Sequence, residues 1–337
     1  MPTMTGPILV LDGGLGTTLE EKYQAKFSSA TSPLWSSHLL ISDPATLSSC
    51  QSAFAQAGAD ILLSATYQVS VEGFSRTKTP EHPDGLPRDK IPKYLQKAIE
   101  IGGGAKNDDG QLALSIGPYG ATMVPSTEYS GIYDEDHDNE EKLLRWHKER
   151  FDLFRSPQDL TQRVDIVALE TLPRTDEIRA VRKLGIGKKF WISVLYPNGK
   201  AMPDGTTPDD AVRAMLRPEQ GSEVPWGVGV NCTKIQDIPS IVRSYEQAIA
   251  QMIENGEARE WPSLVLYPDG TNGGWYDAVA QTWKMPENPP DVPWEQQLLA
   301  VIKETGDRAP WRRIIAGGCC KVNDSDIEKL RACVSRN

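Results

Sequence analysis

The sequence is poor in cysteine and histidine, with five and four residues among 337. So few cysteines, scattered along a chain of this length, exclude a disulfide framework. No two of them have the C-x-x-C spacing, so neither a zinc ribbon nor a thioredoxin-type redox motif is indicated. The cysteines stand at five positions: Cys50, Cys232, Cys319, Cys320 and Cys333.

Positive charge is also scarce. The chain has 36 lysines and arginines against 46 aspartates and glutamates, a net charge of −10 and an isoelectric point of about 5.1. An acidic surface disfavours binding to phosphate backbones and anionic membranes. No run approaches the roughly 18 apolar residues of a membrane span, and the N-terminus lacks the basic and then apolar pattern of a signal peptide. The composition therefore predicts no nucleic-acid partner, no membrane partner and a cytoplasmic location.

What the sequence does contain is a repeated alternation of short apolar runs with helical stretches. Each run is almost continuously hydrophobic, which is typical of parallel strands covered on both faces. Eight such strands alternating with helices predict an α/β fold, a single (β/α)8 TIM-type barrel over residues 1–337 with elaborated loops. The eight runs are Ile8–Asp12, Asp60–Thr66, Leu112–Gly117, Asp165–Thr171, Phe190–Tyr196, Gly227–Cys232, Ser263–Tyr267 and Ile314–Cys319.

Several helices and loops are also indicated. Asp43-Pro44 is typical of a helix start, and Gly58 of the end of the same helix. Further helices are expected over 175–185 and 323–334. The surplus length falls in polar stretches rich in proline and glycine, which we expect to be loops: 73–92, 101–110, 131–142, 198–210 and 268–296.

Three of the five cysteines fall at predicted strand ends. In a barrel of this kind the carboxyl ends of the strands face the active site, and Cys232 ends the sixth strand while Cys319 and Cys320 end the eighth. Three thiolates around Zn²⁺ leave one tetrahedral position open, as in catalytic rather than structural sites. The alternative is that they are buried apolar cysteines, which is the interpretation we keep for Cys50 and Cys333 on predicted helices.

Seven motifs, taken in order, resemble the homocysteine S-methyltransferase family from about residue 8 to 322: LDGGLGT, GAD with SATYQ, SIGPYGA, ALETLP, GVNC, YPDG and GGCC. The resemblance implies one Zn²⁺ per chain held by Cys232, Cys319 and Cys320, with the sulfur of L-homocysteine in the fourth position. It also implies a methyl transfer from a donor to this sulfur, giving methionine. The string TYQVSVEGF resembles members that use the sulfonium donors S-methylmethionine or S-adenosylmethionine rather than betaine.

The same resemblance implies that Asp12 and Glu170 hold the amino group of homocysteine, a role that suits charge-assisted acceptors. The alternative is a buried pair that caps helices or accepts from loop amides. Gly13 and Gly14 belong to a GG-x-G string that differs from the dinucleotide-binding G-x-G-x-x-G, so a close approach of the backbone to the amino acid substrate is expected instead. The candidate substrate-binding set is completed by two further strand-end residues, Thr66 and Asn231.

The donor side is predicted from aromatic residues, because a sulfonium is a soft cation that aromatic faces stabilise. The candidates at strand ends are Tyr67, Gln68, Tyr119 and Tyr267, and packing is the alternative role for each aromatic ring. None of the four histidines falls at a strand end, and we expect them on the surface or in loops. A sulfonium donor leaves as a neutral thioether, so the reaction tolerates the lack of an acid–base histidine.

Two other functions fit the same pattern. One is a barrel that senses thiols or zinc without turnover. The other is a metal-free lyase or aldolase, for which Lys234 is the only lysine near a strand end. Zinc content separates the metal-free enzyme from the methyltransferase, and methionine formation separates the sensor from it. The sequence leaves the choice between the two sulfonium donors open and sets no oligomeric state.

Overall fold

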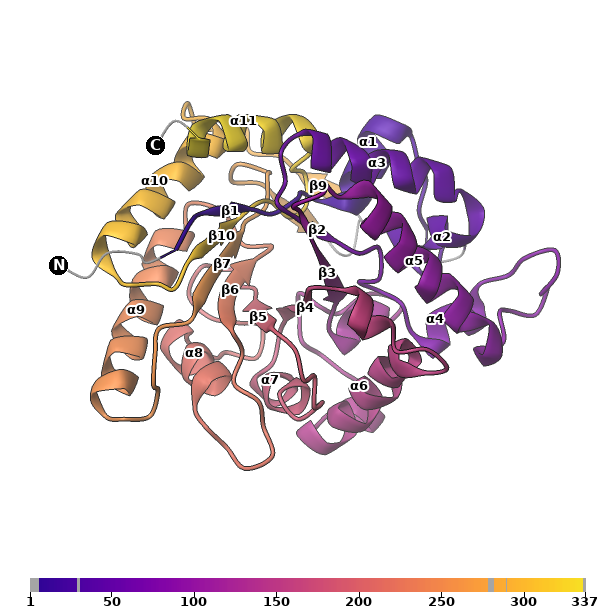
Figure 1. The fold of residues 1–337 in the computed structure, drawn as a ribbon, viewed down its shortest axis with the longest axis horizontal. Helices are drawn as coiled ribbons and strands as arrows, with labels where there is room; N and C mark the ends of the chain where they lie inside the picture. The colour runs from indigo at the N-terminus through magenta and orange to yellow at the C-terminus, as the bar shows by residue number, and fades with distance from the viewer. Residues whose placement is uncertain (1–5, 29–30, 278–281, 289, 336–337) are drawn as a thin grey trace.

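The computed structural model describes residues 6–28, 31–277, 282–288 and 290–335, and eight parallel strands form its centre (Figure 1). Their order is β1-β10-β7-β6-β5-β4-β3-β2. A parallel bridge between Leu11 and Ile61 joins the first and last of them, so the sheet closes into the predicted (β/α)8 barrel. The strands are β1 (Leu9–Val10), β2 (Ile61–Leu63), β3 (Gln111–Ile116), β4 (Ile166–Leu172), β5 (Phe190–Val194), β6 (Gly227–Asn231), β7 (Ser263–Tyr267) and β10 (Ile314–Ala316).

The strands are hydrophobic along their length because both of their faces are covered. On β4, Ile166 and Ala168 belong to a cluster inside the barrel, whereas Val167 and Leu169 belong to the larger core between strands and helices. All four side chains are buried to at least 99%. Because side chains on both faces of the strand are buried, its sequence shows no alternation of polar and apolar residues.

The helices surround the barrel (Figure 1). None of those described is long and apolar enough to cross a membrane. The α-helices are α1 (Leu15–Tyr23), α2 (Leu39–Ser42), α3 (Pro44–Gln56), α4 (Val71–Arg76), α5 (Ile91–Ala105), α6 (Glu140–Arg155), α7 (Thr175–Val181), α8 (Pro208–Leu216), α9 (Ile238–Glu254), α10 (Trp294–Arg308) and α11 (Asp324–Ser335).

The helix expected after Asp43 is confirmed as α3. The carboxylate of Asp43 accepts a hydrogen bond of 3.1 Å from the amide of Thr46, and proline occupies the first helical position. Gly58 follows the end of the helix with φ of +96°, a conformation that favours glycine. Cys50 lies on the buried face of α3, as expected of a structural cysteine.

Each of the five predicted loops overlaps a helix or strand in part, as two of them illustrate. Helix α5 continues to Ala105, although Gly102, Gly103 and Gly104 predicted a loop from residue 101. A Cβ atom at position 102 would lie 2.7 Å from Leu112 of β3, so glycine lets the last turn of α5 approach the strand closely. The segment 268–296 contains a small antiparallel pair, β8 (Trp275–Asp277) and β9 (Thr282–Lys284).

Candidate active site

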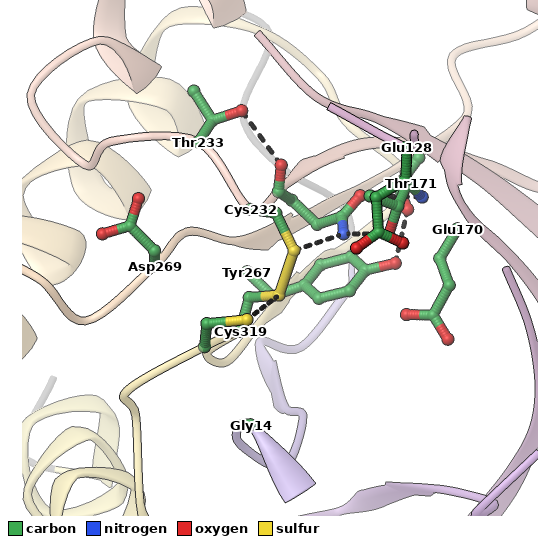
Figure 2. The surroundings of a disulfide bond; sticks show 12 residues. Gly14, Glu128, Glu170, Thr171, Cys232, Thr233, Tyr267, Asp269 and Cys319 are labelled. Atoms are coloured by element: carbon green, nitrogen blue, oxygen red, sulfur yellow. Dashed lines mark hydrogen bonds between the residues drawn. A yellow bond between two sulfur atoms is a disulfide. The ribbon is translucent and has the colours of Figure 1, made fainter. Parts of the chain in front are cut away.

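The three cysteines predicted at strand ends come together at the mouth of the barrel. Cys232 follows β6, Cys319 and Cys320 follow β10, and their Sγ atoms all lie within 4.8 Å of one another. Cys232 and Cys319 are joined by a disulfide in this structure, and the Sγ atom of Cys320 lies 4.0 Å from that of Cys319 (Figure 2). A metal-binding form therefore requires reduction of this bond by two electrons and two protons, which gives two thiols beside the free thiol of Cys320.

The donor set of this site fits a metal ion. Burial raises the pKa of the Cys320 thiol to about 12, with further contributions from the carboxylates of Glu128 and Asp269. Such a thiol keeps its proton at neutral pH unless a cation replaces it. Three sulfur ligands from two loops, with no fourth cysteine or histidine within reach among the described residues, match the open coordination of a catalytic metal site.

Asn231 holds Cys232 in place. Its amide nitrogen donates to Oγ1 of Thr171 at 2.7 Å and lies 3.2 Å from Sγ of Cys232, while its oxygen accepts from the amide of Thr171 at 3.1 Å. Thr171 and Cys232 both have positive φ, +63° and +45°. Residues other than glycine persist in this conformation only where their surroundings fix them. Asn231 is completely buried and supplies that fixation across two strand ends.

The loop that carries the two adjacent cysteines is held through its backbone. The amide of Gly14 donates to the carbonyl of Val322 at 2.8 Å, and the amide of Cys319 donates to that of Pro268 at 2.9 Å. A Cβ atom at Gly13 or Gly14 would lie 2.4 Å from a carbonyl oxygen of this loop. The close backbone approach that the GG-x-G string predicted is therefore made to the cysteine loop, and both glycines also line the cavity beside it.

Two carboxylates are buried at the barrel strands, Asp12 just after β1 and Glu170 on β4. Asp12 accepts a hydrogen bond of 2.8 Å from the amide of Leu63 on Oδ2, whereas its Oδ1 has no partner among the described residues. Burial raises the pKa of Asp12, and repulsion from Glu170 adds to the shift. Burial also raises the pKa of Glu170 to about 7, against hydrogen bonds from Ser115 and Tyr267 that lower it. Neither carboxylate forms an ion pair within the described part of the chain, so both can accept from a cationic ligand.

Part of the predicted site lines one cavity at this end of the barrel. Two of its residues are the predicted donor-side tyrosines Tyr67 and Tyr267, whereas Lys234 does not line it. The lysine that a metal-free lyase would need is therefore not part of this cavity. The predicted site residues that line the cavity are Gly13, Gly14, Tyr67, Glu170, Asn231, Cys232, Tyr267, Cys319 and Cys320.

Four predicted residues do not line this cavity: Asp12, Thr66, Gln68 and Tyr119. The hydroxyl of Thr66 donates to the carbonyl of Ser115 at 2.7 Å. Tyr119 packs edge-on against Tyr133 and Trp146, with ring centroids 5.1 and 5.0 Å away. Packing, the alternative role given to each aromatic residue, is what the structure shows for Tyr119.

Residues 9–334 match the family model described as homocysteine S-methyltransferase. The chain belongs to the homocysteine S-methyltransferase family. It is 29% identical to a betaine-homocysteine S-methyltransferase of Drosophila melanogaster, over 97% of this chain and 94% of the relative. It is 26% identical to a homocysteine S-methyltransferase of Escherichia coli, over 96% of this chain and 94% of the relative.

The fold is shared as well. The metallated form of the homocysteine methyltransferase MmuM from Escherichia coli superposes with a TM-score of 0.69 at 24% identity, over 97% of this chain and 96% of that one. Membership of the homocysteine S-methyltransferase family makes the chain an enzyme that transfers methyl groups. The alternative of a sensor barrel without turnover has no support from these relatives.

Among the residues of the homocysteine S-methyltransferase cavity that the sequence did not predict are Trp35, Glu128 and Tyr129. Trp35 opens a 3₁₀ helix between α1 and α2, and Glu128 and Tyr129 lie in the loop between β3 and α6. The sequence does not mark these three residues, because only residues at strand ends were expected to face the site.

The expectation that the histidines lie on the surface or in loops is wrong for His147. It lies on α6 with 1% of its surface exposed, and its Nε2 is 2.7 Å from the carboxylate of Glu177. The pair is part of the packing between α6 and α7 and does not line the cavity. An acid–base histidine is therefore still missing from the described site.

Proposed function

We propose that the chain is a zinc-dependent methyltransferase that moves a methyl group from S-methylmethionine or S-adenosylmethionine to the thiolate of L-homocysteine, giving methionine. One observation carries the proposal. Three cysteine sulfurs lie within 4.8 Å of one another beside a cavity into which the buried carboxylate of Glu170 also faces. Family membership supplies the reaction class.

After reduction, Cys232, Cys319 and Cys320 would hold the metal, one Zn²⁺ per chain. Sulfur ligands favour zinc over harder divalent ions, and three of them leave a tetrahedral position open. Zinc bound there would lower the pKa of the homocysteine thiol, which is near 8.5 for a free thiol, so that the thiolate forms at neutral pH. The protein contributes the position of the ligands through Asn231 and the two loops.

The amino group of homocysteine would be held by Asp12 and Glu170. Oδ1 of Asp12 has no partner among the described residues, and the carboxylate of Glu170 lines the cavity. An ammonium group would give Oδ1 of Asp12 the donor that it lacks and would add a charge-assisted donor to those that Glu170 already has. Gly13 and Gly14 also line the cavity and, having no side chains, leave room for the backbone atoms of an amino acid.

The methyl transfer needs little help from acids or bases. The homocysteine sulfur attacks the methyl carbon in line, and the electron pair of the breaking bond returns to the donor sulfur, which leaves as a neutral thioether. The rings of Tyr67 and Tyr267 line the cavity and suit a soft cation. The absence of histidine from the described lining agrees with such a mechanism.

The test is a comparison of methyl donors with the reduced, zinc-loaded enzyme. Methionine formation from L-homocysteine is followed with S-methylmethionine, S-adenosylmethionine and betaine in parallel. The proposal expects turnover with at least one sulfonium donor and at most a trace with betaine. Preferential use of betaine, or no methionine with any donor, would contradict it.

The position of Cys232 is expected to depend on Asn231. Replacing Asn231 with alanine removes the amide that contacts both Thr171 and Cys232, and we expect zinc affinity to fall about 10- to 100-fold, as for other residues that orient metal ligands. Competition with a chelator measures the affinity. Ser240→Ala, on the exposed side of α9, is the control. Unchanged affinity in Asn231→Ala would show that Cys232 needs no such support.

The ionisation of Glu170 is expected to appear in the pH dependence of homocysteine binding. Its pKa of about 7 means that the carboxylate is largely ionised at pH 8 and largely protonated at pH 6. Because only the ionised form attracts the ammonium, the wild type should lose about tenfold more affinity between these pH values than Glu170→Gln does. The comparison removes the contribution of the thiol, which both proteins share. Identical pH profiles of the dissociation constant would contradict the assignment.

A further inference from the structure

Glu128 is a second carboxylate that lines the cavity, beside Glu170, and it has no part in the proposed binding of zinc or homocysteine. Glu128 lines the cavity with the three cysteines, and its Oε2 atom accepts a hydrogen bond of 2.7 Å from the hydroxyl of Tyr67. It forms no ion pair with a lysine, arginine or histidine in the described part of the chain. It is partly exposed, so a ligand in the cavity can reach it.

The loop that carries Glu128 is fixed in position. At its two ends, the amide of Tyr119 and the hydroxyl of Tyr133 donate to the carboxylate of Glu177, at 2.7 and 2.5 Å. Within it, the amide of Thr127 donates to the carbonyl of Gly120 at 3.0 Å. The position of Glu128 is therefore fixed before any ligand binds, and a ligand that contacts Glu128 needs to order little of the loop.

The charge of Glu128 acts on the group of residues around the sulfur atoms. Repulsion from it contributes to the raised pKa values of both Glu170 and Cys320. In Figure 2 the side chains of Glu128, Glu170 and Tyr267 gather to one side of the bonded sulfurs, and Asp269 lies to the other side. In the proposed function Asp12 and Glu170 hold the ammonium of homocysteine, which leaves Glu128 for a second positive charge.

We propose that Glu128, oriented by Tyr67, recognises the positive charge of the sulfonium donor and distinguishes it from the neutral thioether product. The inference rests on the proposed function. When the methyl carbon bonds to the homocysteine sulfur, the electron pair of the old bond stays on the donor sulfur and cancels its charge. The attraction to Glu128 disappears in the same step, which favours release of the thioether.

This role has a specific kinetic consequence. The positive charge on the donor sulfur is largest in the bound substrate and already reduced in the transition state. Glu128 therefore stabilises the bound donor at least as much as the transition state, and such an interaction lowers KM without raising kcat. A residue that only supported the fold would lower kcat or the amount of active enzyme instead.

The experiment uses the reduced, zinc-loaded enzyme with saturating L-homocysteine and either S-adenosylmethionine or S-methylmethionine, whichever the wild type turns over. Glu128→Gln should raise the donor KM about 10- to 100-fold, with kcat not lowered by more than about threefold. The inhibition constant of the neutral partner, S-adenosylhomocysteine or methionine, should change less than about threefold. Tyr67→Phe keeps the ring, removes the hydrogen bond and should shift the donor KM in the same direction by a smaller factor.

Glu141→Gln is the matched control, because this glutamate lies on α6 with 87% of its side chain exposed. An equal loss of affinity for donor and thioether, a fall in kcat alone, or an unchanged donor KM in Glu128→Gln would overturn the inference. A weakened homocysteine dissociation constant would also overturn it, because that result moves Glu128 to the acceptor side. If the wild type uses no sulfonium donor at all, the proposed function itself fails. If Glu128→Gln does not fold, Tyr67→Phe decides by the same criteria.

Discussion

Replacing Cys232 with serine is expected to abolish both zinc binding and methyl transfer. Serine has nearly the same size, but its hydroxyl is a poor ligand where a thiolate is required. Without the metal, homocysteine of thiol pKa near 8.5 is only a few per cent thiolate at neutral pH. We expect the turnover rate to fall by roughly 10³-fold or more, equivalent to about 4 kcal/mol of activation free energy.

Metal analysis of the purified variant and a methionine assay measure the two losses. Cys333→Ser is the control, because Cys333 lies on α11, away from the cavity, and is expected to leave zinc content and turnover unchanged. Thermal unfolding of both variants shows whether they fold. A folded Cys232→Ser enzyme with full zinc and full activity would remove this cysteine from the proposed site.

Replacing Glu170 with glutamine is expected to weaken homocysteine binding about 10- to 100-fold while zinc content stays at one per chain. The substitution keeps the shape of the side chain and removes the charge that attracts the ammonium, and charge-assisted hydrogen bonds contribute about 1.5–3 kcal/mol. Glu170 is 4% exposed and lines the cavity, so water compensates only in part.

Calorimetric titration of the reduced, zinc-loaded enzyme with homocysteine gives the dissociation constant directly. The sulfonium donor supplies a second check, because its KM should change less than the affinity for homocysteine. An unchanged homocysteine dissociation constant in Glu170→Gln would leave the carboxylate with a purely structural role, and a parallel loss of zinc would place it with the metal ligands.

The sequence predicts the barrel and the cysteine cluster because both depend on strands. The eight apolar runs are recognisable since strands covered on two faces are hydrophobic at every position. Once the strands are placed, Cys232, Cys319 and Cys320 must share one end of the barrel, whatever their separation in the sequence. The topology brings the three cysteines to one end of the barrel, and the contacts of Asn231 and of the cysteine loop place their sulfur atoms within 4.8 Å of one another.

Loop residues could not be predicted in this way. Glu128 reaches the cavity because Glu177 of α7 accepts hydrogen bonds from Tyr119 and Tyr133. These two tyrosines lie near the two ends of the loop that carries Glu128. Trp35 lies over Gly16, where a Cβ atom would come within 2.4 Å of its ring. These contacts join segments far apart in the sequence, and neither periodicity nor a strand end marks them. The end of helix α5 could not be predicted for the same reason. Gly102 packs against Leu112, and this contact between distant elements keeps the last turn helical although three glycines disfavour it.

The most direct test of the account is a titration of zinc into the reduced apoenzyme, with zinc content and methionine formation measured on the same samples. Zinc is removed with a chelator in the presence of a reductant, which keeps Cys232 and Cys319 from forming their disulfide, and is then returned in steps. The account predicts that activity rises in proportion to bound zinc and reaches its plateau at one zinc per chain. Full methionine formation by protein that contains no zinc would contradict the central claim.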